Sequence, residues 1–257
     1  MTRTDSRPQT ATTTPTTATT KTGTTIAAAP TAPTATRALS RGAVGRARLL
    51  GGAVLAGPFF LAAGITQGIL REGYDFTRNA FSQLSLGEGG WIQRTVFVLT
   101  AALVLAGAAG LRQALRDGPG GTWAPRLVGL FGISCLAAAV FDADPGAGFP
   151  AGAPEERVPS MSTEGMLHML AGMVGYLALC AAFLVLARHF AAAGARGWAR
   201  GCRIVPAGVL AGFVGSAGSV LAFASGAALG LLWLAAVAAR IGRGTPVVTG
   251  DRQNHSS

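Results

Sequence analysis

The sequence predicts an all-α, polytopic membrane protein with six transmembrane helices and both termini in the cytoplasm. Three observations lead to this fold class. Long apolar runs, almost without charge, fill the chain from Leu49 to Ala239. Only 12% of the residues are charged, whereas soluble domains carry about 25%. Arginines flank the runs on alternate sides, which is typical of a chain that crosses a membrane repeatedly.

Residues 1–48 are predicted to form a disordered cytoplasmic tail. The segment is rich in Thr, Ala and Pro and has almost no large apolar residue before Leu39. Such a segment cannot bury enough apolar surface to offset the entropy of ordering. The first apolar run begins too late, and is too long, for a signal peptide.

Six spans are expected in the domain 49–240. The first run, Leu49–Leu70, has 22 residues without a charge, which is enough to cross a hydrocarbon core of about 30 Å. The last run, Ile204–Ala239, would be about 54 Å long as one helix. It should therefore form two helices with a tight turn around Ser219–Ser225. The predicted spans are 49–70, 95–111, 127–141, 165–187, 204–220 and 224–239, and a short cytoplasmic tail, 241–257, follows them.

The distribution of charge supports this count. With the N-terminus inside, the inner segments hold 14 arginines and the outer segments hold four, while eight of the eleven acidic residues lie outside. Five spans would place Arg240 and Arg243 outside, against the positive-inside rule. The net charge of +10 is therefore assigned to an anionic membrane surface and not to nucleic acid. The expected location is the cytoplasmic (inner) cell membrane, as a multi-pass protein.

Small residues four apart recur within the apolar runs. Gly64 and Gly68 form one pair, Gly208 and Gly212 a second, and Gly226 and Gly230 a third. In lipid, small residues at this spacing let helix backbones approach closely. These positions are predicted to be packing faces.

The sequence contains no motif for a cofactor. A Walker loop, a dinucleotide fingerprint, an HExxH motif and paired CxxC motifs are all missing. Cys135, Cys180 and Cys202 have neither a disulfide nor a metal-site spacing. The expected partners are the lipid bilayer and a lipid-like or small apolar ligand. The protein partner is unknown, and no cofactor is expected.

The first outer loop, Gly73–Trp91, is the first candidate for a functional site. Asp75 is placed to cap a short helix in which Phe76, Ala80 and Leu84 repeat every four residues. This spacing predicts an amphipathic helix at the membrane interface. Its more polar side would carry Arg78, Asn79, Ser82 and Ser85.

The second outer loop begins with FDADPGAGFP, Phe141–Pro150. Asp142 and Asp144 follow the third predicted span. Glu164 and His168 lie four residues apart at the start of the fourth, where a carboxylate can orient and charge an imidazole. All these polar residues are expected at one membrane depth on the outer side.

Three interpretations of this outer cluster stay open. The residues can serve as caps and turns, or they can bind a lipid or small molecule. They can also belong to a membrane-embedded hydrolase or transferase acting at the outer leaflet. In that enzyme, His168 would be the base, Ser82 or Ser85 the nucleophile, and Asp144 or Asp142 the orienting group. The aspartates and His168 can alternatively hold a metal ion that activates water.

At these residues the chain resembles the bacterial membrane family called domain of unknown function 998. The stretches that carry the resemblance are GYDFTRNAFSQLSLGEGGW, PRLVGLFG (Pro125–Gly132), FDADPGAGFP and GMLHMLAG (Gly165–Gly172). The resemblance covers about Leu49 to Arg240 and implies a six-helix integral membrane protein, without an established activity. The polar positions typical of the family fall on Tyr74, Asp75, Arg78, Asn79, Ser82, Asp144, Pro145 and His168. The candidate binding residues are Tyr74, Asp75, Arg78, Asn79, Ser85 and Glu164.

Overall fold

The computed structural model describes residues 32–155 and 161–244. The secondary structure of this part of the chain is helical. Its elements are α1 (Ala32–Leu70), η1 (Phe81–Ser85, a 3₁₀ helix), α2 (Gly90–Ala114), α3 (Trp123–Val140), α4 (Thr163–Ala192), α5 (Arg196–Gly215) and α6 (Val220–Arg243).

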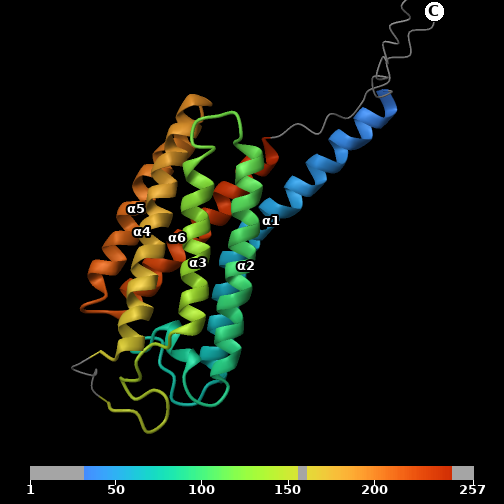
Figure 1. The fold of residues 1–257 in the computed structure, drawn as a ribbon. Coiled ribbons are helices and arrows are strands. Elements are labelled where there is room, and N and C mark those ends of the chain that lie inside the picture. Colours follow the sequence, from blue (N-terminus) through green and yellow to red (C-terminus); the bar gives the residue numbers. More distant parts are fainter. Residues whose placement is uncertain (1–31, 156–160, 245–257) are drawn as a thin grey trace, which may run out of the picture.

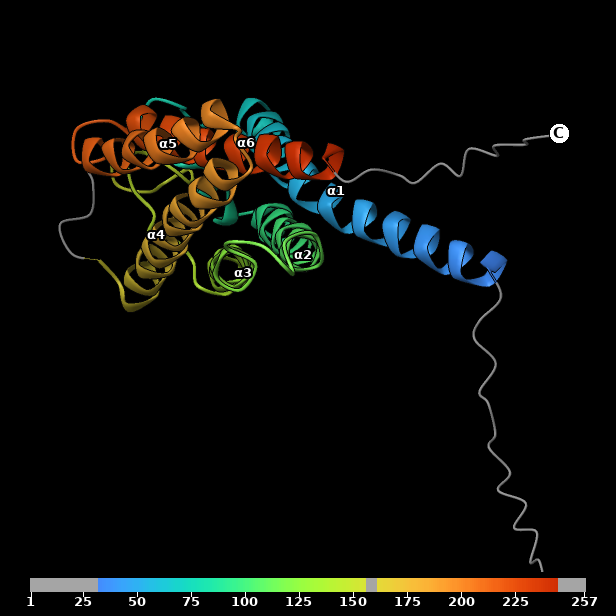
Figure 2. The ribbon, with the colours of Figure 1, turned by 90° about the horizontal axis from the view of Figure 1, so that it is seen from above.

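The helices follow one another around a single bundle. Each α-helix packs against the next one in the chain, and α6 packs against α1, which closes the ring (Figure 1). In the view from above, α2 and α3 stand almost end-on, whereas α4 is tilted (Figure 2). α4 and α6, which α5 separates in the chain, touch each other at only a few positions. α5 lies between them and packs against both, so α4 and α6 are not neighbours in the ring.

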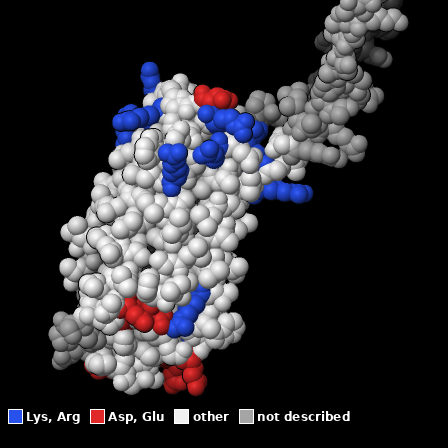
Figure 3. All heavy atoms as spheres, in the orientation of Figure 1, with Lys and Arg blue, Asp and Glu red and all other residues white. Residues whose placement is uncertain are grey.

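The surface of the bundle is that of a membrane protein. On the face shown in Figure 3, a broad belt without charged side chains separates an end with mostly arginines from an end with mostly acidic residues. Five described helices, all except α5, are long and apolar enough to cross a membrane. α5 begins with Arg196, Arg200 and Arg203, which lower the hydropathy of its first half. The chain is a polytopic helical membrane protein.

We call the two ends of the bundle the basic end and the acidic end. The basic end carries the α2–α3 and α4–α5 connections. The acidic end carries two long loops, the first at residues 71–89 and the second at residues 141–162, of which residues 156–160 lie outside the described part. Together the two loops form what we call the cap.

The predicted tail, 1–48, needs a correction. α1 begins at Ala32, so residues 32–48 belong to a helix. This stretch is rich in Ala and Arg, which are strong helix formers, and it continues into an apolar helix that is already nucleated. The remainder of the predicted tail, 1–31, and residues 245–257 at the other terminus lie outside the described residues.

The long apolar run 204–239 forms two helices, as expected, but the turn comes earlier than predicted. α5 ends at Gly215 and α6 begins at Val220. Ser219 caps α6, because its hydroxyl accepts a hydrogen bond from the Ala222 amide at 3.4 Å. Ser219 is thus the last residue of the turn and not the first. α2 and α4 extend beyond the apolar runs 95–111 and 165–187 at both ends, and α3 covers Trp123–Val140 where 127–141 was expected.

Glycines make the contact between α1 and α2 very close. A Cβ on Gly110 would lie 2.7 Å from the Leu50 backbone nitrogen, and one on Gly107 would collide with Ala53. α5 and α6 meet in the same way, since a Cβ on Gly212 would lie 2.8 Å from the Gly226 Cα. These contacts are the close backbone approach that small residues permit in lipid. Gly64 and Gly68 differ from this pattern and receive aromatic rings of the first loop.

Candidate functional site

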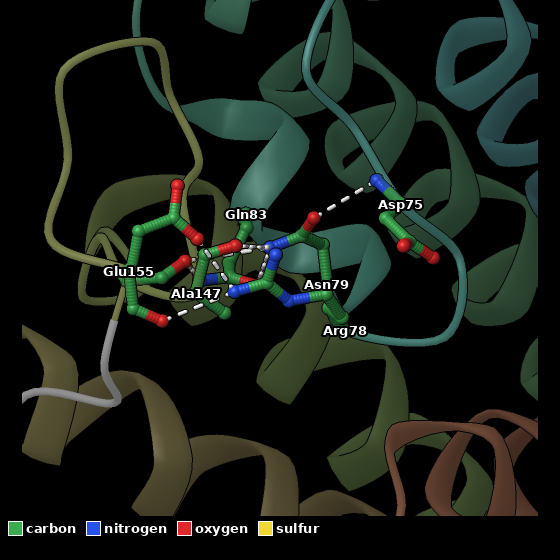
Figure 4. Close-up of polar contacts among 7 residues, drawn as sticks. Asp75, Arg78, Asn79, Gln83, Ala147 and Glu155 are labelled. Atoms are coloured by element: carbon green, nitrogen blue, oxygen red, sulfur yellow. Dashed lines mark hydrogen bonds and ion pairs between the residues drawn. The ribbon is translucent and has the colours of Figure 1, made fainter.

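Asn79 and Gln83 join the two loops of the cap (Figure 4). The buried Asn79 amide nitrogen donates to the carbonyls of Gly146 and Ala147, both at 3.4 Å. The Gln83 amide nitrogen donates to the carbonyls of Asp144 and Gly146 at 3.2 and 3.3 Å. These side chains satisfy carbonyls of a loop that has no regular secondary structure to pair them. Asn79 and Gln83 therefore hold the second loop over the end of the bundle.

Arg71, the residue after α1, holds the first loop against the end of the bundle. Its guanidinium donates to the Leu86 carbonyl at 2.7 Å and to the Leu84 carbonyl at 3.4 Å. It also lies 5.3 Å from the centre of the buried Phe149 ring, so that it contacts both loops. A planar guanidinium suits this role because it presents several donors in a fixed geometry.

Tyr74 and Asp75, two candidate binding residues, shape the start of the first loop. The Tyr74 hydroxyl donates to the Asn79 carbonyl at 2.9 Å. Burial, and secondarily the charge of Asp75, raise the pKa of Tyr74 above its ordinary value, so the phenol remains protonated. The Asp75 carboxylate accepts hydrogen bonds from the hydroxyl and amide of Thr77 at 2.6 and 2.7 Å. These two hydrogen bonds lower the pKa of Asp75.

The predicted interfacial helix over Phe76–Leu84 is wrong. Residues 75–79 form turns, and only the short helix η1 follows, at Phe81–Ser85. The Phe76 and Phe81 rings lie against Gly68 and Gly64 of α1, where a Cβ would meet them at 2.5 and 2.8 Å. The two glycines leave room on α1 for the rings, and the rings draw the loop onto the bundle instead of into the interface.

His168 lies inside the bundle and is bonded to the backbone. Its Nδ1 is 2.8 Å from the Phe141 carbonyl oxygen, at the end of α3. Its ring lies edge-on to that of Phe97, with 6.1 Å between the ring centres, and only 7% of the residue is exposed. Glu164, one turn earlier on α4, is exposed. Since a carbonyl can only accept, Nδ1 of His168 carries the proton.

The two aspartates have separate structural partners. Asp142 forms an ion pair with Arg94 at the start of α2. Asp144 accepts a hydrogen bond from the Ser162 amide at 3.1 Å and lies against Gly165, where a Cβ would collide with its carboxylate. Asp144 thus sits at the N-terminus of α4, where the helix dipole favours a negative charge.

The predicted serines lie in η1. The Ser85 hydroxyl is buried and donates to the Ser82 carbonyl at 2.7 Å. Ser82 lines the cavity described below. Among residues 32–155 and 161–244, no hydrogen bond joins His168 to either serine or to either aspartate. In the same part of the chain, no group of three or more His, Cys, Asp and Glu side chains is arranged to hold a metal ion.

A cavity of about 500 Å³ lies beneath the cap, inside the ring of helices. Its volume falls within the range of roughly 300–1,000 Å³ that is usual for small-molecule sites. All six helices contribute to its wall, and the aromatic lining comes from Phe60, Phe81, Phe97, Phe131, Tyr176, Phe213 and Phe223. The cap contributes polar groups at the acidic end, namely Arg78, Ser82, Gln83 and Asp144. The cavity therefore has a polar roof and an apolar interior.

One face of α4 provides much of the wall. The lining residues of this helix are spaced by three and four, as for a single helical stripe: Gly165, His168, Met169, Gly172, Met173 and Tyr176. A Cβ on Gly172 would meet no atom within 4 Å, so this glycine faces open space in the middle of the stripe. Flexible methionine side chains flank it and can adapt to ligands of different shape.

Several residues of the site could not be identified as functional from the sequence. Arg71 is one of the four arginines of the predicted outer segments and has no other sequence signal, and Thr100 lies within an apolar run. Gln67 lies in the first apolar run and donates to Gln93 of α2 at 2.7 Å. Gly172 and Gly175 follow His168 on α4, four and seven residues later. Of these last two, Gly172 lines the cavity, whereas Gly175 packs against Ser134 of α3.

The model of the family "Protein of unknown function (DUF998)" matches residues 54–240. The chain belongs to this family. The match runs from within α1 to within α6 and includes the cap, and so confirms the resemblance seen in the sequence. No curated protein and no solved structure matches the chain. The DUF998 family has no established activity, so a function has to be argued from the cavity and the cap.

Proposed function

We propose that this DUF998 protein binds or moves a lipid-like or small apolar ligand in the cavity beneath its cap. The observation that carries this proposal is the cavity itself, a space of about 500 Å³ walled by aromatic rings and methionines and roofed by polar side chains. In lipid-exposed helices, close packing normally fills such a volume. A ligand with an apolar body and a polar end matches the two kinds of wall.

The proposal includes an orientation in the membrane. We place the acidic end, with its cap, outside the cytoplasmic membrane and the basic end in the cytoplasm, because arginines mark cytoplasmic segments. α5 is counted as a sixth span, since it packs against both α4 and α6 within the ring. Six spans put both termini in the cytoplasm, and the cavity then lies at the depth of the outer leaflet.

This orientation is tested with reporters. A phosphatase reporter, active only outside the cytoplasm, is fused after Ser257 or inserted after Gly152, an exposed position of the cap. We expect activity from the insertion at Gly152 and none from the terminal fusion. An active terminal fusion would overturn the six-span topology.

The route into the cavity is placed where the lining side chains are small or flexible. The stripe on α4 presents Met169, Gly172 and Met173 to the cavity. Ala224, Ala227 and Ala228 of α6 also line the cavity. Small side chains on one helix and flexible ones on the other form a wall that an apolar chain from the bilayer can cross.

Blocking the cavity tests the binding function. Gly172→Phe fills open space on the cavity wall, and Gly129→Phe adds the same ring to α3 at a glycine that also has no atom within 4 Å of its Cβ but does not line the cavity. The proteins are purified in mild detergent, and native mass spectrometry counts the bound lipid-like molecules. We expect the wild type and Gly129→Phe to retain a ligand and Gly172→Phe to lose it. Equal ligand content in all three proteins, or none in the wild type, would overturn the proposal.

A further inference from the structure

Thr100 is a buried polar residue without a partner in the wall of the cavity. Only 1% of the residue is exposed, and its hydroxyl has no hydrogen bond within the described part of the chain. Leaving a buried hydroxyl unpaired is unfavourable by about 1–3 kcal/mol. Thr100 lines the cavity from α2. A ligand in the cavity can supply the missing partner.

His168 offers a second free polar atom to the same space. Its Nδ1 donates to the Phe141 carbonyl, and Nε2, which has no hydrogen bond within the described residues, can accept one from a ligand. His168 also lines the cavity, and its ring contacts Phe97. Phe97 and Thr100 are three residues apart on α2, so they occupy neighbouring positions on one face of that helix. The imidazole and the hydroxyl thus flank a common aromatic wall.

Among the described residues, the other polar groups of the lining are already engaged, except the Ser82 hydroxyl in the cap. The Ser134 hydroxyl donates to the Phe131 carbonyl at 2.7 Å, and Gln83 is bonded to carbonyls of the second loop. Arg78 is paired with Glu155, and Asp144 receives the Ser162 amide. Arg78 and Asp144 are the charged side chains that line the cavity, within the described residues, and both belong to the cap. A charged group bound deeper would have no counter-charge, which is strongly unfavourable.

We propose that the ligand is an uncharged, hydroxyl-bearing amphiphile, of the class of long-chain alcohols and monoacylglycerols. Its hydroxyl donates to Nε2 of His168, and an oxygen of its head group accepts a hydrogen bond from Thr100. The chain extends along the aromatic wall towards α6. This inference rests on the proposed binding function and names the chemistry that the cavity selects.

The test compares probes with one chain and three head groups. Wild-type protein in nanodiscs is titrated with oleyl alcohol, oleyl methyl ether and oleate, and binding is measured by native mass spectrometry. The ether keeps an acceptor but has no hydroxyl to donate, and oleate carries a charge at neutral pH. We expect oleyl alcohol to bind about tenfold more tightly than either of the other probes, as for one or two hydrogen bonds.

Three variants separate ligand recognition from folding. Thr100→Val removes the hydroxyl at nearly constant shape. His168→Asn keeps an amide donor near the position of Nδ1, for the Phe141 carbonyl, and removes the acceptor. Ser134→Ala removes a cavity hydroxyl that is already bonded within its own helix, and serves as the matched control. We expect a three- to tenfold loss of affinity for oleyl alcohol in the first two variants and none in Ser134→Ala.

The outcomes are distinguishable. Equal affinity for alcohol and ether, or a loss in only one of Thr100→Val and His168→Asn, would overturn the hydroxyl assignment and leave the binding function intact. If His168→Asn does not fold, Thr100→Val and the three probes still decide the question. Binding of no probe to the wild type would overturn the hydroxyl assignment. If the wild type also retains no lipid-like molecule on purification, the proposed function fails as well.

Discussion

The side of the bundle formed by α1 and α2 contrasts with the side formed by α4 and α6. α1 and α2 touch through glycines, with backbone against backbone, and Arg71 fastens the loop between them. On the other side, Gly172 faces the cavity, and α4 and α6 are joined through α5, which packs between them. Both sides are apolar and rich in small residues, so composition does not separate them. What differs is whether another backbone or the cavity lies opposite the glycines, and we call the first the packed side and the second the accessible side.

The largest loss of stability is expected when a glycine of the packed side is enlarged. Gly107→Val would force α1 and α2 apart, because the added side chain meets the Ala53 backbone and Cβ. We expect a destabilisation of about 3 kcal/mol, the upper part of the range for overpacking, measured by unfolding in detergent. Gly51→Val is the control, since a Cβ there meets nothing within 4 Å. If both variants unfold alike, the close contact of the two helices is not what stabilises this side.

A second prediction concerns the anchoring of the cap to the packed side. Arg71→Ala leaves the carbonyls of Leu84 and Leu86 without their charged donor and removes the cation from the Phe149 ring. We expect a loss of about 2 kcal/mol, as for a hydrogen bond to a charged group, and faster amide hydrogen exchange in residues 84–90. Arg112→Ala, an exposed arginine near the basic end, should leave the exchange of these residues unchanged. Unchanged exchange in Arg71→Ala would show that aromatic packing alone holds the first loop.

The packed side also contains a polar pair, and its contribution should be small. Gln67 donates to Gln93 at 2.7 Å, but Gln67 Oε1 and Gln93 Nε2 are buried and have no partner within the described residues. Interhelical hydrogen bonds in membrane proteins contribute about 0.6 kcal/mol on average. We expect a coupling of this size from a double-mutant cycle of Gln67→Leu and Gln93→Leu, followed by reversible unfolding. A coupling above about 2 kcal/mol would mean that the pair, and not the glycine contact, joins α1 to α2.

These two sides also show how far the sequence can predict the structure. Apolar runs and arginines predict the helices because the bilayer demands about 20 apolar residues per span and places positive charge on one side. They do not predict which glycines meet a backbone, because Gly107 and Gly172 look alike until the ring has closed. The same limit applies to the first loop. Phe76 and Phe81 have the spacing of an interfacial helix, yet the space above Gly64 and Gly68 decides where they go.

For the candidate site, the sequence identifies some residues but not their partners. His168 was identified from its sequence position, and it does line the cavity. Its partner is the Phe141 carbonyl, which no pattern of side chains can indicate. Asn79 and Gln83 likewise bond to carbonyls of the second loop, whose path depends on turns at Gly146 and Gly148. Contacts between side chains and distant backbone atoms therefore remain beyond a sequence-based prediction, even where the residue itself is found.

The smallest expected effect lies in the cap, at an exposed ion pair between its two loops. Arg78 and Glu155 form an ion pair at 2.8 Å, but their side chains are 46% and 77% exposed. Exposed pairs contribute about 0–1 kcal/mol and are screened by salt. Arg78 also donates to the Glu155 main-chain carbonyl at 3.1 Å, and this hydrogen bond survives in Glu155→Gln. We therefore expect Glu155→Gln to change the free energy of unfolding by less than about 0.5 kcal/mol.

Ligand affinity provides a sharper measurement of the same variant. If the ion pair between Arg78 and Glu155 has no effect on ligand entry, Glu155→Gln and the wild type should bind oleyl alcohol equally at low and at high salt. Gly172→Phe, measured beside them, gives the signal for a blocked cavity. An affinity that changes in Glu155→Gln by more than about threefold, and only at low salt, would show that this ion pair controls access to the cavity. The accessible side would then be gated by charge, whereas the packed side is held by backbone contact.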